Sequence, residues 1–179
     1  MAEELFSREE RERLEGSEFA VCAATFYDDL AERLVNGAVE AFAAAGISPA
    51  SVDTYEVPGA FELPLAAKLC AESGRFAGVA CVGVVIRGET AHWEYVAGAA
   101  ARGIARAALD TGIPTTFGVI TALTAEQAWA RAGGAVGNRG EEAALAAIEM
   151  SDWLRRVGAG ARRLPGRRAS RGRRRTSRS

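Results

Sequence analysis

The chain contains one histidine, His92, and it follows a short polar segment, Arg87-Gly88-Glu89-Thr90, that comes directly after the most hydrophobic run. An imidazole with an unperturbed pKa of about 6.5 can pass protons near neutral pH. Gly88 would let backbone amides approach an anion, and Thr90 is expected to cap the following helix while offering a hydroxyl to a phosphate. The segment therefore indicates proton transfer beside a bound anion. The same spacing fits a solvated histidine in the first turn of a helix equally well.

Four aromatic residues, Phe26, Tyr27, Phe61 and Phe117, are expected at or beside the ends of strands. An aromatic face in such a place can stack on a flat heterocycle. Glu62, at the start of a helix, would face the crevice beyond these strand ends. Taken singly, each aromatic residue is more often a core residue. A carboxylate at the start of a helix is usually there because it interacts favourably with the helix dipole.

A phosphate could also be held by Arg131 through its planar guanidinium, although an arginine on a helix is ordinarily a solvated charge. The sequence has no GxxxxGK[ST] loop, no GxGxxG after the first strand and no His or Cys cluster. These absences disfavour nucleoside triphosphates, dinucleotides and catalytic metals. Cys22, Cys70 and Cys81 lie in apolar segments without zinc-site or disulfide spacing, so we expect buried thiols in a reducing cytoplasm.

Short β-rich runs alternate with longer Ala- and Leu-rich stretches, which predicts an α/β three-layer sandwich with a four-stranded parallel sheet flanked by helices. The expected strands are 19–24, 52–56, 78–86 and 115–120, and the expected helices are 28–45, 62–73, 92–111, a short one beginning at Thr124, and about 138–157. Gly46, Gly74 and Gly112 are expected to end the first three helices in a left-handed conformation. Because ligands of such sheets bind beyond the carboxyl ends of the strands, the chemistry-bearing segments should meet there.

The 179 residues fit one domain, expected at 19–157, after a charged N-terminal segment, 1–18. The remaining residues, 158–179, form an Arg-rich tail that we expect to be disordered. This tail holds nine arginines and no acidic residue, which leaves the rest of the chain with a net charge of −10. The N-terminal segment has no signal-peptide core, and the most apolar run, 76–86, falls short of the ~20 residues that span a bilayer. We therefore expect a cytoplasmic protein without a membrane span.

Several motifs occur in one order and at a consistent spacing. They are Val57-Pro-Gly-Ala-Phe-Glu-Leu-Pro64, Gly83-Val-Val-Ile-Arg-Gly-Glu-Thr-Ala-His92, Phe117-Gly-Val-Ile-Thr121, Glu126-Gln-Ala-Trp-Ala-Arg-Ala-Gly133 and Gly137-Asn-Arg-Gly140. Together they resemble the signature of lumazine synthases over about residues 19–155. The resemblance implies a flavodoxin-like fold and the condensation of 5-amino-6-(D-ribitylamino)uracil with L-3,4-dihydroxy-2-butanone 4-phosphate. The products would be 6,7-dimethyl-8-ribityllumazine, phosphate and water, and no cofactor or metal would be needed.

One group of residues is assigned by this resemblance to the uracil substrate. Phe26 would stack on the pyrimidine. Those expected to hold the ribityl chain are Ala60, Phe61 and Glu62, and those expected to edge the ring are Val84, Val85 and Ile86.

A second group is assigned to the phosphate and to proton transfer. Glu89 and Thr90 would meet the phosphate through backbone amides and a hydroxyl, Arg131 would bind the same phosphate, and His92 would be the acid and base. Phe117 would complete the pocket of a neighbouring subunit, so an isolated monomer would be an incomplete enzyme.

Three positions depart from the family pattern. Thr25 stands where an arginine is usual, Tyr27 replaces a commoner small polar residue, and Arg139 replaces a frequent lysine while keeping its charge. These changes bear on substrate affinity more than on the type of reaction.

The resemblance also implies a homo-oligomer. Family members form pentamers, twelve of which close into an icosahedral shell in many cases, and association with riboflavin synthase is a further expected partnership. An alternative function is a non-catalytic flavin-binding cage or scaffold of the same fold. A third hypothesis makes the Arg-rich tail an arm that binds nucleic acid or cargo.

Overall fold

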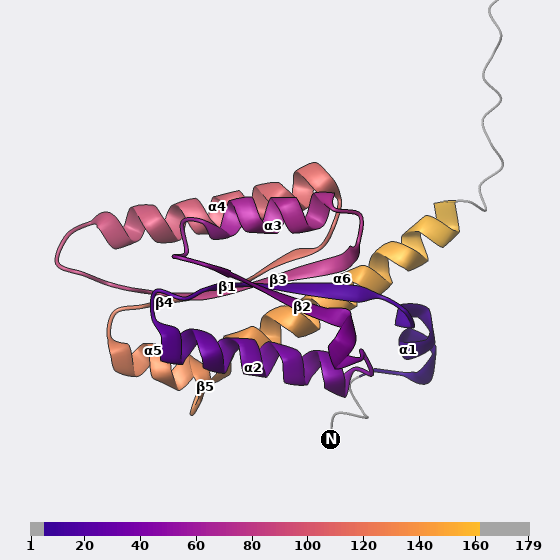
Figure 1. Cartoon of the computed structure of the whole chain (residues 1–179), viewed down its shortest axis with the longest axis horizontal. Helices are drawn as coiled ribbons and strands as arrows, with labels where there is room; N and C mark the ends of the chain where they lie inside the picture. Colours follow the sequence, from indigo (N-terminus) through magenta and orange to yellow (C-terminus); the bar gives the residue numbers. More distant parts are fainter. Residues whose placement is uncertain (1–5, 162–179) are drawn as a thin grey trace, which may run out of the picture.

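A parallel sheet of four strands, in the order β2-β1-β3-β4, forms the centre of the molecule (Figure 1). The computed structural model describes residues 6–161. In chain order the elements are α1 (Arg8–Leu14), β1 (Glu18–Ala24), α2 (Asp28–Ala44), the 3-10 helix η2 (Pro49–Ser51), β2 (Val52–Val57), α3 (Leu63–Glu72), β3 (Phe76–Ile86), α4 (His92–Thr111), β4 (Thr115–Ala122), α5 (Ala125–Arg131), β5 (Ala132–Gly134), β6 (Gly137–Asn138) and α6 (Arg139–Ala161).

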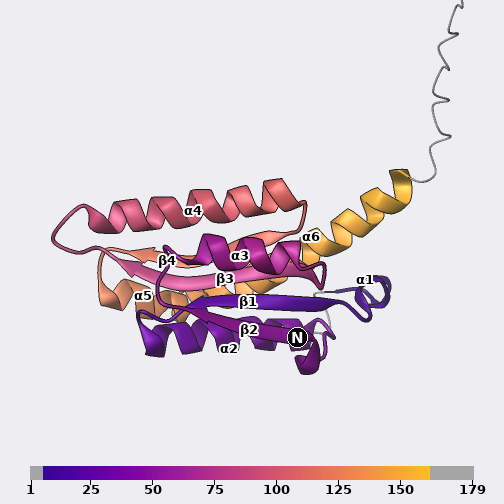
Figure 2. The same ribbon diagram turned by 45° about the horizontal axis from the view of Figure 1, so that its top comes forward.

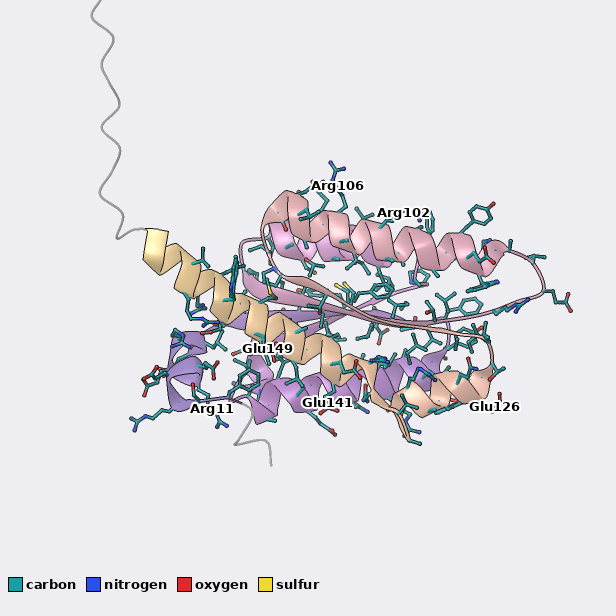
Figure 3. The ribbon with its side chains drawn as sticks, turned by 180° about the vertical axis from the view of Figure 1, so that it is seen from behind. Arg11, Arg102, Arg106, Glu126, Glu141 and Glu149 are labelled. Atoms are coloured by element: carbon teal, nitrogen blue, oxygen red, sulfur yellow. The ribbon has the colours of Figure 1, made fainter. Side chains whose placement is uncertain are left out.

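Helices cover both faces of this sheet, so the predicted three-layer α/β sandwich is confirmed. Helices α3 and α4 lie on one face, and α2, α5 and α6 lie on the other (Figures 1 and 2). Alternate residues of β1 enter two separate cores, with Val21 on the side of α2 and α6 and Cys22 on the side of α3 and α4. Charged side chains such as Arg102 and Arg106 lie on the outer side of α4 (Figure 3). The strands are consequently apolar throughout because each of their faces is covered.

The four predicted strands and the helices that follow them are confirmed, with ends that differ by one or a few residues. Gly46, Gly74 and Gly112 have φ angles of 89°, 73° and 70°, so the predicted left-handed conformations at the helix ends are also confirmed. Thr124 begins α5 as predicted, because its hydroxyl accepts a hydrogen bond from the amide of Gln127 at 3.3 Å.

The C-terminal helix is longer than the sequence indicated. Asn138 precedes α6 and its Oδ1 accepts the amide of Gly140 at 2.8 Å, as an N-terminal cap does. The helix continues to Ala161, four residues beyond the expected end of the domain at residue 157. Residues 162–179, the remainder of the predicted tail, lie outside the described part of the chain.

The first described helix, α1, was not foreseen within the charged N-terminal segment. Ser7 and Glu10 form a reciprocal capping box at its start. Helix α1 is held against α6 by Asp152, a carboxylate only 5% exposed that accepts hydrogen bonds from Arg13 and, at 2.9 Å, pairs with Arg156. Two cations therefore compensate the burial of one acidic group.

The short antiparallel hairpin formed by β5 and β6 was also not foreseen. Gly133 and Gly137 have φ angles of 87° and 106°, so they turn the chain where other residues would be strained. Arg33 of α2 donates a hydrogen bond to the Gly133 carbonyl at 3.3 Å and lies over the ring of Trp129. The hairpin is thus held against α2 and α5.

No helix within residues 6–161 is long and apolar enough to cross a membrane.

The crossing of α2 and α6 depends on Gly140. A Cβ atom at this position would lie 1.9 Å from the carbonyl oxygen of Leu34, so any larger residue forces the two helices apart. We expect Gly140→Ala to lower the free energy of unfolding by about 3 kcal/mol or more. Gly158→Ala is the matched control, because nothing lies within 4 Å of its Cβ position. That control should change stability by less than about 1 kcal/mol, in the stabilising direction. Urea denaturation at equal protein concentrations measures both, and equal effects of the two variants would contradict the close approach.

All three cysteines are buried thiols, as predicted. The sulfur atoms of Cys22 and Cys70 lie 3.8 Å apart, and the neighbouring Cys22 thiol together with burial raises the pKa of Cys70 above its usual value. We expect iodoacetamide at pH 8 to alkylate Cys70 in the native protein at least about tenfold more slowly than in the unfolded chain. Peptide mass spectrometry gives both rates, and equal rates would contradict the prediction.

The raised pKa of Cys70 also makes stability depend on pH. Because the unfolded thiol loses its proton from about pH 8.5 while the folded thiol keeps it, the free energy of unfolding should fall as the pH rises above that value.

Candidate active site

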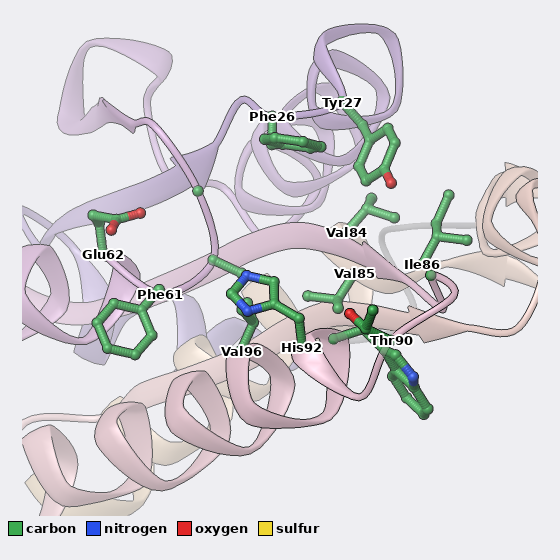
Figure 4. A pocket seen from close by; sticks show the side chains of 14 residues that line it. Phe26, Tyr27, Phe61, Glu62, Val84, Val85, Ile86, Thr90, His92 and Val96 are labelled. Carbon is green, nitrogen blue, oxygen red and sulfur yellow. The ribbon is translucent and has the colours of Figure 1, made fainter.

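A cleft of about 600 Å³ opens at the carboxyl ends of the strands, where ligands of open parallel sheets bind. Three loops form it, following β1, β2 and β3 (Figure 4). The residues that line it are Phe26, Tyr27, Gly59, Ala60, Phe61, Glu62, Val84, Val85, Ile86, Gly88, Thr90, His92, Trp93 and Val96. Its lining is mainly apolar and aromatic, with a few polar groups from separate elements, which is the composition of a small-molecule site.

The floor of the cleft is the end of β3, with Val84 and Val85 buried and Ile86 partly buried. Successive residues of a strand point to opposite faces, so Val84 packs with the core beneath α2 while Val85 packs with the core beneath α3 and α4. The floor therefore lies at the carboxyl end of a central strand, with side chains on both faces of the sheet. A flat apolar ring can lie across it without meeting a charge.

Two aromatic rings stand above this floor on different loops. Phe26, between β1 and α2, is 72% exposed, and Phe61, between β2 and α3, is 60% exposed. The Phe26 ring meets Tyr27 edge-on, with ring centroids 5.0 Å apart and an interplanar angle of 77°. Large apolar side chains left this exposed at the mouth of a cleft indicate a surface that a ligand or a second chain covers.

The turn after β2 sets the positions of Ala60, Phe61 and Glu62. The amide of Glu62 donates to the carbonyl of Gly59 at 3.2 Å, which closes the turn and leaves Ala60 buried and Phe61 exposed. A Cβ atom on Gly59 would lie 3.1 Å from Glu62 Oε2, so glycine leaves room for this carboxylate. Glu62 directly precedes α3, and its side chain makes no capping hydrogen bond there. Its oxygens are consequently available to hydroxyl groups of a ligand.

His92 is the first residue of α4, and its imidazole lies in the middle of the cleft between the Phe61 side and Thr90 (Figure 4). The residue that precedes α4 is Ala91, and no side chain caps the helix. The expectation that Thr90 caps α4 was therefore wrong, because the hydroxyl lies one residue too early for that bond. The uncapped amides and the helix dipole make this end of α4 electropositive beside Thr90 and Gly88.

Nine of the twelve residues that the family resemblance assigns to the site line this one cleft: Phe26, Ala60, Phe61, Glu62, Val84, Val85, Ile86, Thr90 and His92. Tyr27 and Gly88, which the sequence analysis also singled out, line it as well. Glu89 belongs to the same loop but is not among the lining residues. Phe117 and Arg131 lie elsewhere in the chain.

Phe117 is the third residue of β4 and pairs with Cys81, well before the strand ends at Ala122. The expectation that it falls at or beside a strand end was wrong, and it did not fit the expected strand 115–120, which already runs past this residue. Its ring is 43% exposed on an edge strand of the sheet. Arg131 ends α5, and its guanidinium donates to the carbonyl of Gln127 in its own helix at 3.0 Å. Neither side chain reaches the cleft of its own chain.

Trp93 and Val96 also line the cleft, although sequence reasoning did not single them out. Val96 could have been found, since it lies four residues after His92 and so on the same face of α4. Trp93 gave no such signal, because the residue next to His92 points about 100° away from it around an ideal helix. Among residues 6–161, no group of three or more His, Cys, Asp or Glu side chains is arranged to hold a metal ion.

Comparison of the sequence with known proteins identifies a family. Residues 16–155 match the family model described as 6,7-dimethyl-8-ribityllumazine synthase. The chain is also 49% identical over 142 residues to a protein of Syntrophus aciditrophicus (strain SB) named 6,7-dimethyl-8-ribityllumazine synthase, an alignment that covers 79% of this chain and 92% of that relative. The family model spans most of the chain, and every cleft residue falls inside the matched range. The chain therefore belongs to the 6,7-dimethyl-8-ribityllumazine synthase family.

Proposed function

We propose that this chain catalyses the condensation of 5-amino-6-(D-ribitylamino)uracil with L-3,4-dihydroxy-2-butanone 4-phosphate, giving 6,7-dimethyl-8-ribityllumazine for riboflavin synthesis. The observation that carries the proposal is a single cleft in which an apolar, aromatic seat adjoins the uncapped end of α4, with His92 between them. Family membership supports the same reaction. A non-catalytic cage or scaffold of the same fold is less well supported, because such a protein would not need an imidazole in the cleft.

The uracil ring would lie on the floor formed by Val84, Val85 and Ile86, with Phe26 over its face. Its ribityl chain, which carries only hydroxyl groups, would run along Ala60 and Phe61 to the carboxylate of Glu62. That carboxylate can accept two or more hydrogen bonds.

The phosphate of the second substrate would lie at the start of α4, beside Gly88 and Thr90. Glu89 would contribute its backbone amide there. In this position the ketone carbon comes near the uracil amine and near His92, so the two reactants are held together before any bond forms.

The chemistry then needs proton transfers at each stage. The uracil amine adds to the ketone and water leaves to give an imine. Elimination of phosphate then produces an enol, which tautomerises to a new ketone at the carbon that carried the hydroxyl group. Attack of the ribityl-bearing nitrogen on this new carbonyl closes the ring with loss of a second water. His92 can accept and return the protons of these steps. The electropositive helix end stabilises the leaving phosphate.

We further propose that Phe117 and Arg131 act in the cleft of a neighbouring subunit. Two geometric facts support this: neither side chain reaches its own cleft, and Phe117 is exposed on an edge strand where a second chain can pack. Arg131 would then bind the phosphate from across the interface. A pentamer in the cytoplasm is the assembly we propose, and light scattering distinguishes it from a larger shell.

The function is tested by mixing the purified protein with both substrates and following lumazine absorbance above the spontaneous rate. We expect His92→Ala to lower kcat by about 10²- to 10³-fold, because one group serves several proton transfers. Light scattering should show an unchanged assembly, so that the loss reports chemistry. A variant that keeps wild-type turnover would remove His92 from the mechanism, whereas an inactive wild-type protein would sink the proposed function.

The shared site is tested by complementation between variants. We expect His92→Ala and Arg131→Ala to be impaired when each is assembled alone, with Arg131→Ala chiefly raising KM for the butanone phosphate. In oligomers refolded from an equal mixture, roughly a quarter of the sites would combine an intact His92 with a neighbour's intact Arg131. Activity should therefore rise well above the mean of the two variants. If it equals that mean, the two residues act from the same chain.

A further inference from the structure

Tyr27 occupies a position where its side chain gives little to its own helix. It directly precedes α2, and no side chain makes a capping hydrogen bond at that end. Ser, Thr, Asp or Asn at such a position stabilises a helix by about 1 kcal/mol relative to residues that cannot cap. A tyrosine there forgoes that contribution, so its ring and hydroxyl are better explained by the cleft that it lines.

The ring of Tyr27 is half-buried, while that of its neighbour Phe26 is mostly exposed. Tyr27 packs against the core on the α2 side of the sheet, together with Ile86. From there its ring meets Phe26 nearly at right angles. Among the described residues, Phe26 makes no aromatic contact other than this one with Tyr27. Tyr27 therefore limits how the Phe26 ring can tilt.

The hydroxyl of Tyr27 points away from Phe26, toward Val84 and Ile86 at the floor of the cleft (Figure 4). It has no hydrogen-bond partner among residues 6–161. The floor beside this hydroxyl is apolar, so the hydroxyl of Tyr27 is the polar group that a ligand lying against Val84 and Ile86 would meet there. A phenol both donates and accepts one hydrogen bond, which suits the alternating carbonyl and N–H groups on the edge of a uracil.

We propose that Tyr27 is a specificity-determining residue for the heterocyclic substrate. Its hydroxyl hydrogen-bonds a polar atom on the uracil edge, and its ring holds Phe26 in the plane that stacks on the uracil face. This assignment rests on the proposed function and adds a second, edge-directed contact to the stacking described above. The butanone phosphate, at the start of α4, does not meet Tyr27.

Two substitutions at Tyr27 and one control substitution outside the cleft test the assignment. We expect Tyr27→Phe, which removes only the hydroxyl, to raise KM for the ribitylaminouracil about five- to tenfold with kcat within twofold. Tyr27→Ala, which also removes the support for Phe26, should raise it about a hundredfold. KM for the butanone phosphate should stay within twofold in both. Tyr55→Phe is the control, since it also removes one hydroxyl group, which donates to Asp53 and accepts from Arg75, but this tyrosine lies on β2 outside the cleft.

A binding measurement separates affinity from turnover. Fluorescence titration with 6,7-dimethyl-8-ribityllumazine, which keeps the pyrimidine edge, should show the same ranking of dissociation constants for the wild type, Tyr27→Phe and Tyr27→Ala. Wild-type constants for Tyr27→Phe would overturn the hydroxyl contact. An increase confined to KM for the butanone phosphate would overturn the placement at the heterocycle. Failure of the wild-type protein to form lumazine would count against the proposed function itself, and product binding would still test Tyr27.

Discussion

Strand β3 pairs in parallel with β1 on one side and β4 on the other, and it is buried along nearly its whole length. A strand in that position must satisfy its backbone groups within the sheet and fit its side chains to both helical layers at once. Its last residues, Val84 to Ile86, belong to the packed core and also form the floor of the cleft. The location of the floor is thus determined by packing on both sides of the sheet. The three loops that carry the aromatic and polar groups are positioned relative to it.

The reaction proposed for this cleft requires two reactants held side by side and several proton movements. Close positioning of reactants can account for a large part of a rate enhancement. The sequence supplies this with apolar residues, two aromatic rings and one helix end rather than with a cluster of charged groups. This explains why each of these residues looked unremarkable alone and became informative only as a set at one edge of the sheet.

Much of the fold was predictable because long buried strands and capped helices leave strong local patterns. The same rule predicted that the loops after all four strands would meet. Those after β1, β2 and β3 form one cleft that nine expected residues line, whereas the loop after β4 contributes no lining residue. Phe117 was misplaced although its strand was predicted, because the residue lies near the start of β4 and so remote from the carboxyl end where the cleft opens. Helix α1 was missed because its sequence is almost entirely charged and its docking depends on Asp152, 139 residues away from Arg13. The hairpin of β5 and β6 is too short to show alternation.

The Asp152 contact joins the two ends of the described chain into one structural unit. Helix α1 and the second half of α6 both lie at the amino-end side of the sheet, opposite the carboxyl ends where the cleft opens (Figure 1). Any segment or fused domain attached near Arg8 or beyond Ala161 would begin at the pole of the molecule remote from substrate entry. Within one chain, charge, affinity tags or peptides added at the termini would therefore begin far from the site where the chemistry is proposed to occur.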